Sequence, residues 1–158
     1  MSLLIIWHSR TGASEQMAQA AMQGCRAGDQ CVAADAVTSE QILEAGGYLF
    51  VCPENLGSMT GAMKEMFDRT YYDALGRIEG RPYSTIIAAG SDGEGALRQI
   101  DRIATGWRLR RVAEAKIVNF HAQTAEQIWA LKTVDREVLS DCRAIGAGLS
   151  EGVALGVF

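Results

Sequence analysis

Short apolar runs recur along the chain, and the stretches between them carry apolar residues at helical spacing. Five runs predict strands, at residues 3–8, 31–36, 47–53, 84–90 and 113–120. The first, third and fourth runs are apolar at nearly every position rather than at alternate ones. This pattern is typical of strands that are buried on both faces, as in a parallel sheet covered by helices.

The intervening stretches predict five helices, at residues 13–25, 38–46, 61–75, 95–107 and 134–155. Their apolar residues fall three and four positions apart, which gives each helix one apolar side. Strands and helices alternate along the whole length, with no repeat and no linker. The pattern therefore predicts an α/β fold in a single domain over residues 1–158: a doubly wound, five-stranded parallel sheet with helices on both faces.

Composition narrows the function classes only a little. The chain has 158 residues, is 48% hydrophobic and 22% charged, and carries a formal net charge of −4, which indicates a soluble globular protein. So mild a charge does not select a nucleic acid or a membrane surface, and we expect neither as a partner. The first residues lack the basic region of a signal peptide, and no apolar run reaches the roughly 18 residues of a membrane span. We expect a cytoplasmic protein.

The four cysteines form no C-x-x-C pair and no metal-ligand spacing: Cys25, Cys31, Cys52 and Cys142. Small buried or half-buried thiols in a reducing compartment are the plain interpretation. We expect no metal site.

Ligands of an open parallel sheet bind beyond the carboxyl ends of its strands, so the loops after the predicted strands matter most. The first, "HSRTGASEQ" at residues 8–16, offers the hydroxyls of Ser9, Thr11 and Ser14, with Gly12 at the start of a helix. Hydroxyls beside a helix N-terminus suit a phosphate. The loop matches neither the P-loop nor the dinucleotide fingerprint. An ordinary turn capped by its own serine or threonine is the alternative.

Two further loops contain residues that let a ligand approach the backbone. In residues 52–69, Pro53 stops the strand and Gly57 and Gly61 permit tight curvature, so a planar ligand could lie against this loop. Residues 89–100 place three glycines within six positions after a buried strand. Each loop alone is also compatible with an ordinary surface turn.

Together the three loops resemble those of the flavodoxin-like FMN-binding family. "SRTGASE" fits the pattern [ST]-x-T-G-x-[ST]-E, the second loop fits P-x-x-x-G-x-M-x-G-x-M-K-x-x-x-D-R, and the third is similar to G-[ST]-x-x-G-G. Within that family the chain is most similar to NAD(P)H-dependent FMN reductases and to the flavodoxin-like NAD(P)H:quinone reductases once described as tryptophan-repressor-binding proteins. The resemblance runs from Leu3 to about Val118 and implies the flavodoxin strand order 2-1-3-4-5.

The resemblance also implies which residues would bind FMN. The phosphate would be enclosed by Ser9, Arg10, Thr11, Gly12, Ala13 and Ser14. The isoalloxazine ring would be bordered by Pro53, Glu54, Asn55, Leu56, Gly57, Ser58 and Met59. The flavin edge would be covered by Gly90, Ser91, Asp92, Gly93 and Gly95, with Glu94 where the family often has glycine.

A flavin carries its own chemistry, so we expect no catalytic side chain, and we interpret His8 and His121 as incidental loop histidines. The second and third loops hold no aromatic residue that would sandwich a ring. This favours a reductase that takes electrons from NAD(P)H and passes them to flavin, quinone or a similar small acceptor. The alternatives are a flavodoxin-type electron carrier and a flavin-free interaction domain. The chain also lacks the insertion near the fourth strand, and the following histidine, that quinone reductases usually carry.

Two surface features have more than one interpretation. The arginines Arg98, Arg102, Arg108, Arg110 and Arg111 could receive an NADPH phosphate, although such a run is more often a solvated face. The aromatics of residues 70–75, Trp107 and the apolar tail at 152–158 indicate self-association, which the family resemblance also implies. We expect a homo-oligomer; the alternative is that the tail occupies a groove in its own domain.

Overall fold

One sheet runs through the computed structural model, which describes residues 1–158, in the order β2-β1-β3-β5-β6, with β4 paired to β3 and β7 paired to β5. The strands are β1 (Leu3–Trp7), β2 (Gln30–Ala33), β3 (Gly47–Asn55), β4 (Ser58–Met59), β5 (Pro82–Ala89), β6 (Arg110–Arg111) and β7 (Lys116–Asn119). All pairs are parallel except β3 with β4. The short strand β4 lies off this order, so β5 is the fourth strand of the parallel sheet, and β6 and β7, which both pair with β5, together occupy the fifth position. The predicted strand order 2-1-3-4-5 is therefore confirmed.

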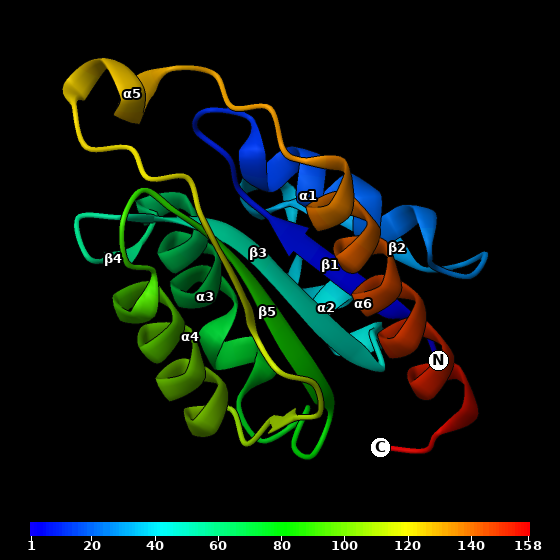
Figure 1. The fold of residues 1–158 in the computed structure, drawn as a ribbon. Helices are drawn as coiled ribbons and strands as arrows, with labels where there is room; N and C mark the ends of the chain where they lie inside the picture. The colour runs from blue at the N-terminus through cyan, green and yellow to red at the C-terminus, as the bar shows by residue number, and fades with distance from the viewer.

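Six α-helices connect and cover the strands: α1 (Ala13–Gln23), α2 (Ser39–Glu44), α3 (Gly61–Ala74), α4 (Glu94–Gly106), α5 (Ala125–Trp129) and α6 (Arg136–Leu155). Helices α1 and α6 cover one face of the sheet, and α2, α3 and α4 cover the other (Figure 1). Helix α5 stands apart from both layers, above the upper edge of the sheet. The sequence pattern predicted the other five helices and missed α5.

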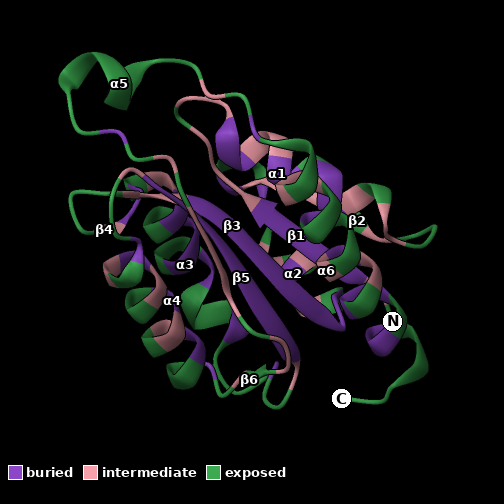
Figure 2. Cartoon of the chain, viewed as in Figure 1, coloured by how far each residue is buried: buried purple, intermediate pink, exposed green.

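The central strands are buried on both faces, as their continuous apolar runs predicted (Figure 2). Along β1, Leu3 and Ile5 pack in the cluster that includes α1 and α6, whereas Leu4 and Ile6 pack in the cluster on the opposite face. Each such side chain contributes about 1.5–3 kcal/mol when it leaves water. The sheet is thus fixed from both sides, and its edge offers a rigid base for loops.

The second predicted strand is shorter than residues 31–36, because its last three residues, Ala34–Ala36, form a 3₁₀ turn. The guanidinium of Arg69 in α3 donates hydrogen bonds to the carbonyls of Ala34 and Val37 and holds this turn. The last strand also begins later than predicted, at Lys116.

The carboxyl ends of β1, β3 and β5 lie together at the upper edge of the sheet in Figure 1. The chain that leaves β7 crosses this edge on its way to α6. No helix combines the length and the apolar character needed to cross a membrane.

Candidate functional site

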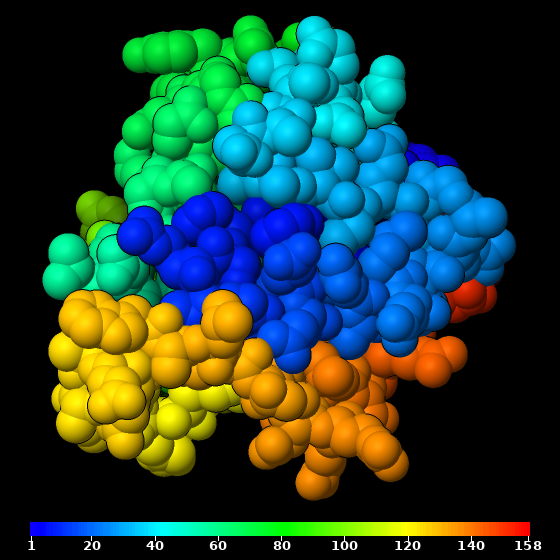
Figure 3. All heavy atoms as spheres, turned by 90° about the horizontal axis from the view of Figure 1, so that it is seen from above, coloured from blue at the N-terminus to red at the C-terminus, as the bar shows by residue number.

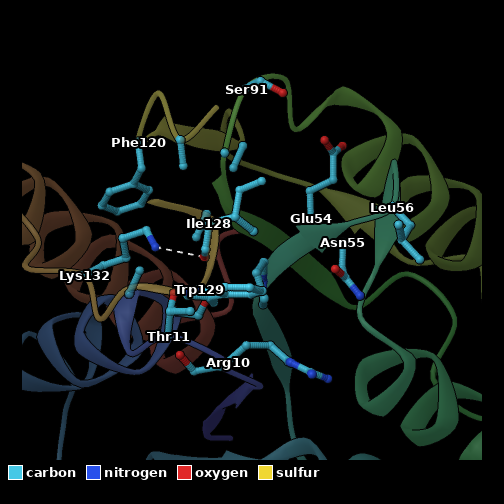
Figure 4. Close-up of a pocket in the computed structure, with 18 of the residues that line it drawn as sticks. Arg10, Thr11, Glu54, Asn55, Leu56, Ser91, Phe120, Ile128, Trp129 and Lys132 are labelled. Atoms are coloured by element: carbon cyan, nitrogen blue, oxygen red, sulfur yellow. Dashed lines mark hydrogen bonds between the residues drawn. The ribbon is translucent and has the colours of Figure 1, made fainter. Parts of the chain in front are cut away.

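A cavity of about 420 Å³ lies at this upper edge, within the range of small-molecule sites. Four segments form its walls: the loop after β1, the loop after β3, the end of β5 with its loop, and the chain between β7 and α6 (Figure 4). Twelve of the residues that the sequence analysis assigned to FMN line it: Ser9, Arg10, Thr11, Ala13, Ser14, Pro53, Glu54, Asn55, Leu56, Gly57, Gly90 and Ser91.

The other assigned residues lie nearby but do not line the cavity: Gly12, Ser58, Met59, Asp92, Gly93 and Gly95. Met59 is buried in the core cluster of α3 and α4, and the Ser58 hydroxyl donates to Gln99 Oε1 at 2.5 Å. Gly93 lies so close to Ile117 that a Cβ would stand 2.6 Å from Ile117 Cγ2. Through these contacts, Met59, Ser58 and Gly93 help to hold the loops in place without facing the cavity.

The loop after β1 leaves several hydrogen-bonding groups unused. Helix α1 begins after Gly12, whose φ of +92° suits glycine and whose N–H donates to Ser9 Oγ at 3.0 Å. The N–H groups of Ala13 and Ser14 have no acceptor in the protein, as the first turn of a helix leaves them free. Ser14 is 1% exposed, and its buried hydroxyl also has no hydrogen-bond partner. A buried, unpaired hydroxyl on a cavity wall indicates a ligand that completes it.

The cavity wall at the start of α1 can attract an anion without a basic side chain placed to pair with it. Only Arg10 and Lys132 are basic among the residues that line the cavity, and Arg10 is exposed. The Lys132 ammonium donates to three carbonyls of α5 and the residue after it, at 2.6–3.1 Å. Hydroxyls, free N–H groups and the positive end of α1 therefore remain for an anion, and a phosphate fits this donor set.

The loop after β3 is a two-residue hairpin turn. Leu56 (φ +55°) and Gly57 (φ +70°) both have positive φ and connect β3 to the antiparallel β4. Leucine rarely adopts this conformation, and its side chain here is 97% exposed at the rim of the cavity. Such a residue is available for apolar contact with a ring bound in the cavity.

Glu54 has a structural partner that the sequence analysis did not foresee. Its two carboxylate oxygens accept the Gly93 N–H at 2.9 Å and the Ala96 N–H at 3.1 Å, so Glu54 caps the start of α4. A Cβ on Gly95 would stand 2.0 Å from the Gly57 carbonyl oxygen. The second and third loops are therefore packed against each other and form one wall.

The chain between β7 and α6 forms the wall that the sequence analysis missed. It contributes Phe120, Ala122, Ile128, Trp129 and Lys132. The two loops predicted to border the ring hold no aromatic residue, but the segment between β7 and α6 brings two aromatic residues, Phe120 and Trp129, to the cavity. The expectation of a ring edge without aromatic neighbours is therefore incomplete. One signal in the sequence pointed here: "TAEQ" at 124–127 is a capping box, which marks the start of α5.

The histidines and cysteines lie outside the cavity. His8 Nδ1 is 2.9 Å from Thr60 Oγ1, and burial, with Arg10 second, lowers the His8 pKa. All four cysteines are free, and burial raises the pKa of Cys52 to about 12 and that of Cys31 to about 11. None is placed as a nucleophile toward the cavity.

Part of the arginine run lies at the wrong end of the sheet to serve this cavity. Arg110 and Arg111 pair with Pro82 and Tyr83 at the start of β5, whereas Ala88 and Ala89 at its end line the cavity. The rise of a strand puts about 20 Å between the two ends. Arg111 also forms an ion pair with Asp101 at 3.1 Å.

A doubly wound sheet with a ligand cavity over its carboxyl edge, a hydroxyl-lined anion subsite and an apolar wall defines the flavodoxin-like class. Solved structures show the same fold. An archaeal flavodoxin has a TM-score of 0.77 at 16% identity, covering 98% of this chain and 99% of its own. A flavodoxin, WrbA-like protein from Agrobacterium tumefaciens has a TM-score of 0.74 at 15% identity and covers 98% of each chain.

The chain belongs to the NADPH-dependent FMN reductase family, whose model matches residues 10–124. A flavodoxin from Aquifex aeolicus (strain VF5) is 30% identical over 97 residues, which make up 59% of this chain and 52% of that protein. The chain thus spans about half the length of the curated relative that it matches. The protein is therefore a flavodoxin-like member of this family.

Proposed function

We propose that the protein binds one FMN per chain in this cavity and works as an NAD(P)H-dependent reductase of a small acceptor such as a flavin or a quinone. The observation that carries FMN binding is the unpartnered Ser14 hydroxyl, which lies with free N–H groups at the start of α1 on the cavity wall. Membership of the NADPH-dependent FMN reductase family supports the choice of electron donor.

The residues divide the work of holding such a ligand. Ser9, Thr11 and Ser14, with the first N–H groups of α1, would bind the phosphate. Leu56 and Trp129 lie on opposite walls and would border the ring. When bound, FMN would supply the redox chemistry that links a nicotinamide donor to the acceptor. Glu54, the one carboxylate that lines the cavity, already caps α4, so the protein's part is to bind and orient.

A second function has a specific observation in its favour. Trp129 and Phe120 bring aromatic surface to the cavity, a feature that favours a flavodoxin-type electron carrier. The mild net charge of −4 favours the reductase, because carriers of this fold tend to have a strongly acidic face. The two functions differ in whether a nicotinamide reaches the bound flavin.

Anaerobic mixing of the FMN-loaded protein with NADH or NADPH separates them. We expect at least one of the two to bleach the visible absorbance of the bound flavin, and a quinone or free FMN to sustain turnover. Dithionite serves as the control, since it reduces bound flavin without a nicotinamide site. Bleaching by dithionite but by neither nicotinamide would contradict the reductase and support the carrier.

A further inference from the structure

The segment between β7 and α6, residues 120–135, crosses the cavity, and its middle makes no hydrogen bond to the cavity walls. Residues 123–131 make hydrogen bonds only among themselves and with the Lys132 side chain. Helix α5 within it has no buried residue. Seen from above, residues near 130 lie directly against the loop after β1 (Figure 3). The segment has the form of a lid.

Both ends of this lid are tied to the walls of the cavity. At its start, the Phe120 N–H donates to the Ala89 carbonyl and the Ala122 N–H donates to the Gly90 carbonyl, each at 2.8 Å. At its end, the Lys132 N–H donates to the Thr11 carbonyl at 2.9 Å. The lid therefore joins the loop after β5 to the loop proposed to bind the phosphate.

Gln16 in α1 strengthens the second attachment. Its Nε2 donates to the carbonyls of Gly12 at 3.0 Å and Lys132 at 2.8 Å, and its Oε1 accepts the Val134 N–H at 3.1 Å. One side chain thus connects the first turn of α1 with the end of the lid, and the lid is fixed relative to the phosphate subsite.

Helix α5 is held in shape by its own caps. A helix of five residues is not stable alone in water. The Thr124 and Gln127 side chains close a capping box at its start, and the Lys132 ammonium binds the carbonyls of Gln127, Ile128 and Ala130 at its end. These bonds determine where the next side chains point. Figure 4 shows Trp129 and Ile128 between the loop of Thr11 and the loop of Asn55, with Lys132 bonded to the Ile128 carbonyl.

Trp129 is 72% exposed although it lines the cavity, so most of its surface is left open to solvent. Its neighbour Leu131 is 87% exposed and does not line the cavity. An exposed aromatic ring held at a cavity wall by hydrogen bonds on both sides indicates a planar ligand as its partner.

We propose that Trp129 is a positioning residue that covers the planar ring of the bound flavin, and that Lys132 holds it there. This proposal rests on the proposed function, since the ring is that of the FMN whose phosphate occupies the loop after β1. In this arrangement the lid sets how long the ligand stays and how far water and small solutes reach it.

The test compares variants of the full-length protein loaded with FMN, in two measurements that need no turnover. One is the rate at which FMN leaves, and the other is quenching of bound-flavin fluorescence by iodide. Aromatic stacking on a planar base is worth enough that Trp129→Ala should release FMN about tenfold faster and make the bound flavin more accessible to iodide. Trp129→Phe, which keeps a ring, should stay near wild type.

Two further variants make the result specific. Leu131→Ala removes another exposed apolar side chain from the same segment and should behave as wild type. Lys132→Met removes the bonds to the α5 carbonyls and should shift both measurements in the direction of Trp129→Ala. Equal behaviour of Trp129→Ala and Leu131→Ala, with normal FMN binding in both, overturns the lid and leaves the proposed function standing. Failure of the wild type to bind FMN overturns both.

Discussion

Among single residues, Ser14 gives the most direct indication that the cavity binds a ligand. Ser14 is 1% exposed and its hydroxyl has no hydrogen-bond partner, so the protein without ligand carries the cost of desolvating this hydroxyl. A bound phosphate would accept its hydrogen bond. Loss of this hydroxyl should therefore affect binding and folding in opposite ways, which distinguishes a binding role from a packing role.

Replacing Ser14 by alanine should weaken FMN binding by about 1.5–3 kcal/mol, the worth of a hydrogen bond to a charged group. The stability of the ligand-free protein should stay the same or rise, because no bond inside the protein is lost. FMN titration and thermal unfolding measure the two effects. Ser140→Ala, at an exposed position on α6, is the control. Wild-type FMN affinity in Ser14→Ala would mean that the phosphate does not bind at the start of α1.

At the scale of elements, Glu54 shows how the second and third loops depend on each other. Its carboxylate sits at the end of β3 and caps α4, which begins about 40 residues later in the sequence. The resemblance to known loops assigned this residue to the flavin ring. The structure adds that its side chain satisfies two N–H groups of the first turn of α4.

Glu54→Ala should lower the free energy of unfolding by about 1–2 kcal/mol, as loss of a helix cap does, whereas Glu54→Gln keeps one acceptor and should cost less. Urea unfolding of the ligand-free protein measures both. Glu114→Ala, an exposed position whose side chain makes no hydrogen bond, controls for loss of a charge. If Glu54→Ala unfolds like that control, the cap does not contribute to stability.

The elements that the sequence predicted well are those with a long, strong period. The eight successive buried residues of β5, or the apolar side of α4, can be recognised without knowing their neighbours. The end of β2 could not be predicted, because the turn at Ala34–Ala36 is held by Arg69 from a distant helix. Helix α5 has only five residues, none of them buried, which is too short for a helical period to show, and it is visible only through its Thr124–Gln127 capping box.

The same distinction holds for the site. Hydroxyls and glycines after a strand could be read from the sequence, so most of the assigned residues line the cavity. The place of Trp129 on the cavity wall could not be predicted from the sequence, because this residue follows the last predicted strand and lies outside the three family motifs. It reaches the cavity through bonds made by Lys132 and Gln16, which depend on the folded crossing from β7 to α6.

At the scale of the whole molecule, the two hydrophobic clusters share one sheet, and we propose that residues 1–158 unfold as one domain. Trp107, which the sequence analysis counted among the indications of self-association, is 2% exposed, and its ring packs edge-on against that of Phe67 with the centroids 5.3 Å apart, so it is not available for an interface. Phe158 turns back onto Gly152 of its own helix and remains 37% exposed. The tail thus uses a groove of its own chain in part.

Exposed apolar residues remain at the end of α3 and in the tail: Tyr72, Leu75, Leu155 and Val157. We propose that they support a homo-oligomer, which needs well over about 1,000 Å² of buried surface to be specific. Sedimentation at micromolar concentration tests this proposal, and a single species of 17.0 kDa with and without FMN would contradict it.

The central claim is that this cavity holds FMN, and calorimetric titration of the ligand-free protein with FMN tests it most directly. We predict saturable binding of one FMN per chain at micromolar or tighter affinity, with weaker binding in Ser14→Ala and normal binding in Ser140→Ala. No saturable binding by the wild-type protein, or equal binding by the two serine variants, would contradict the account.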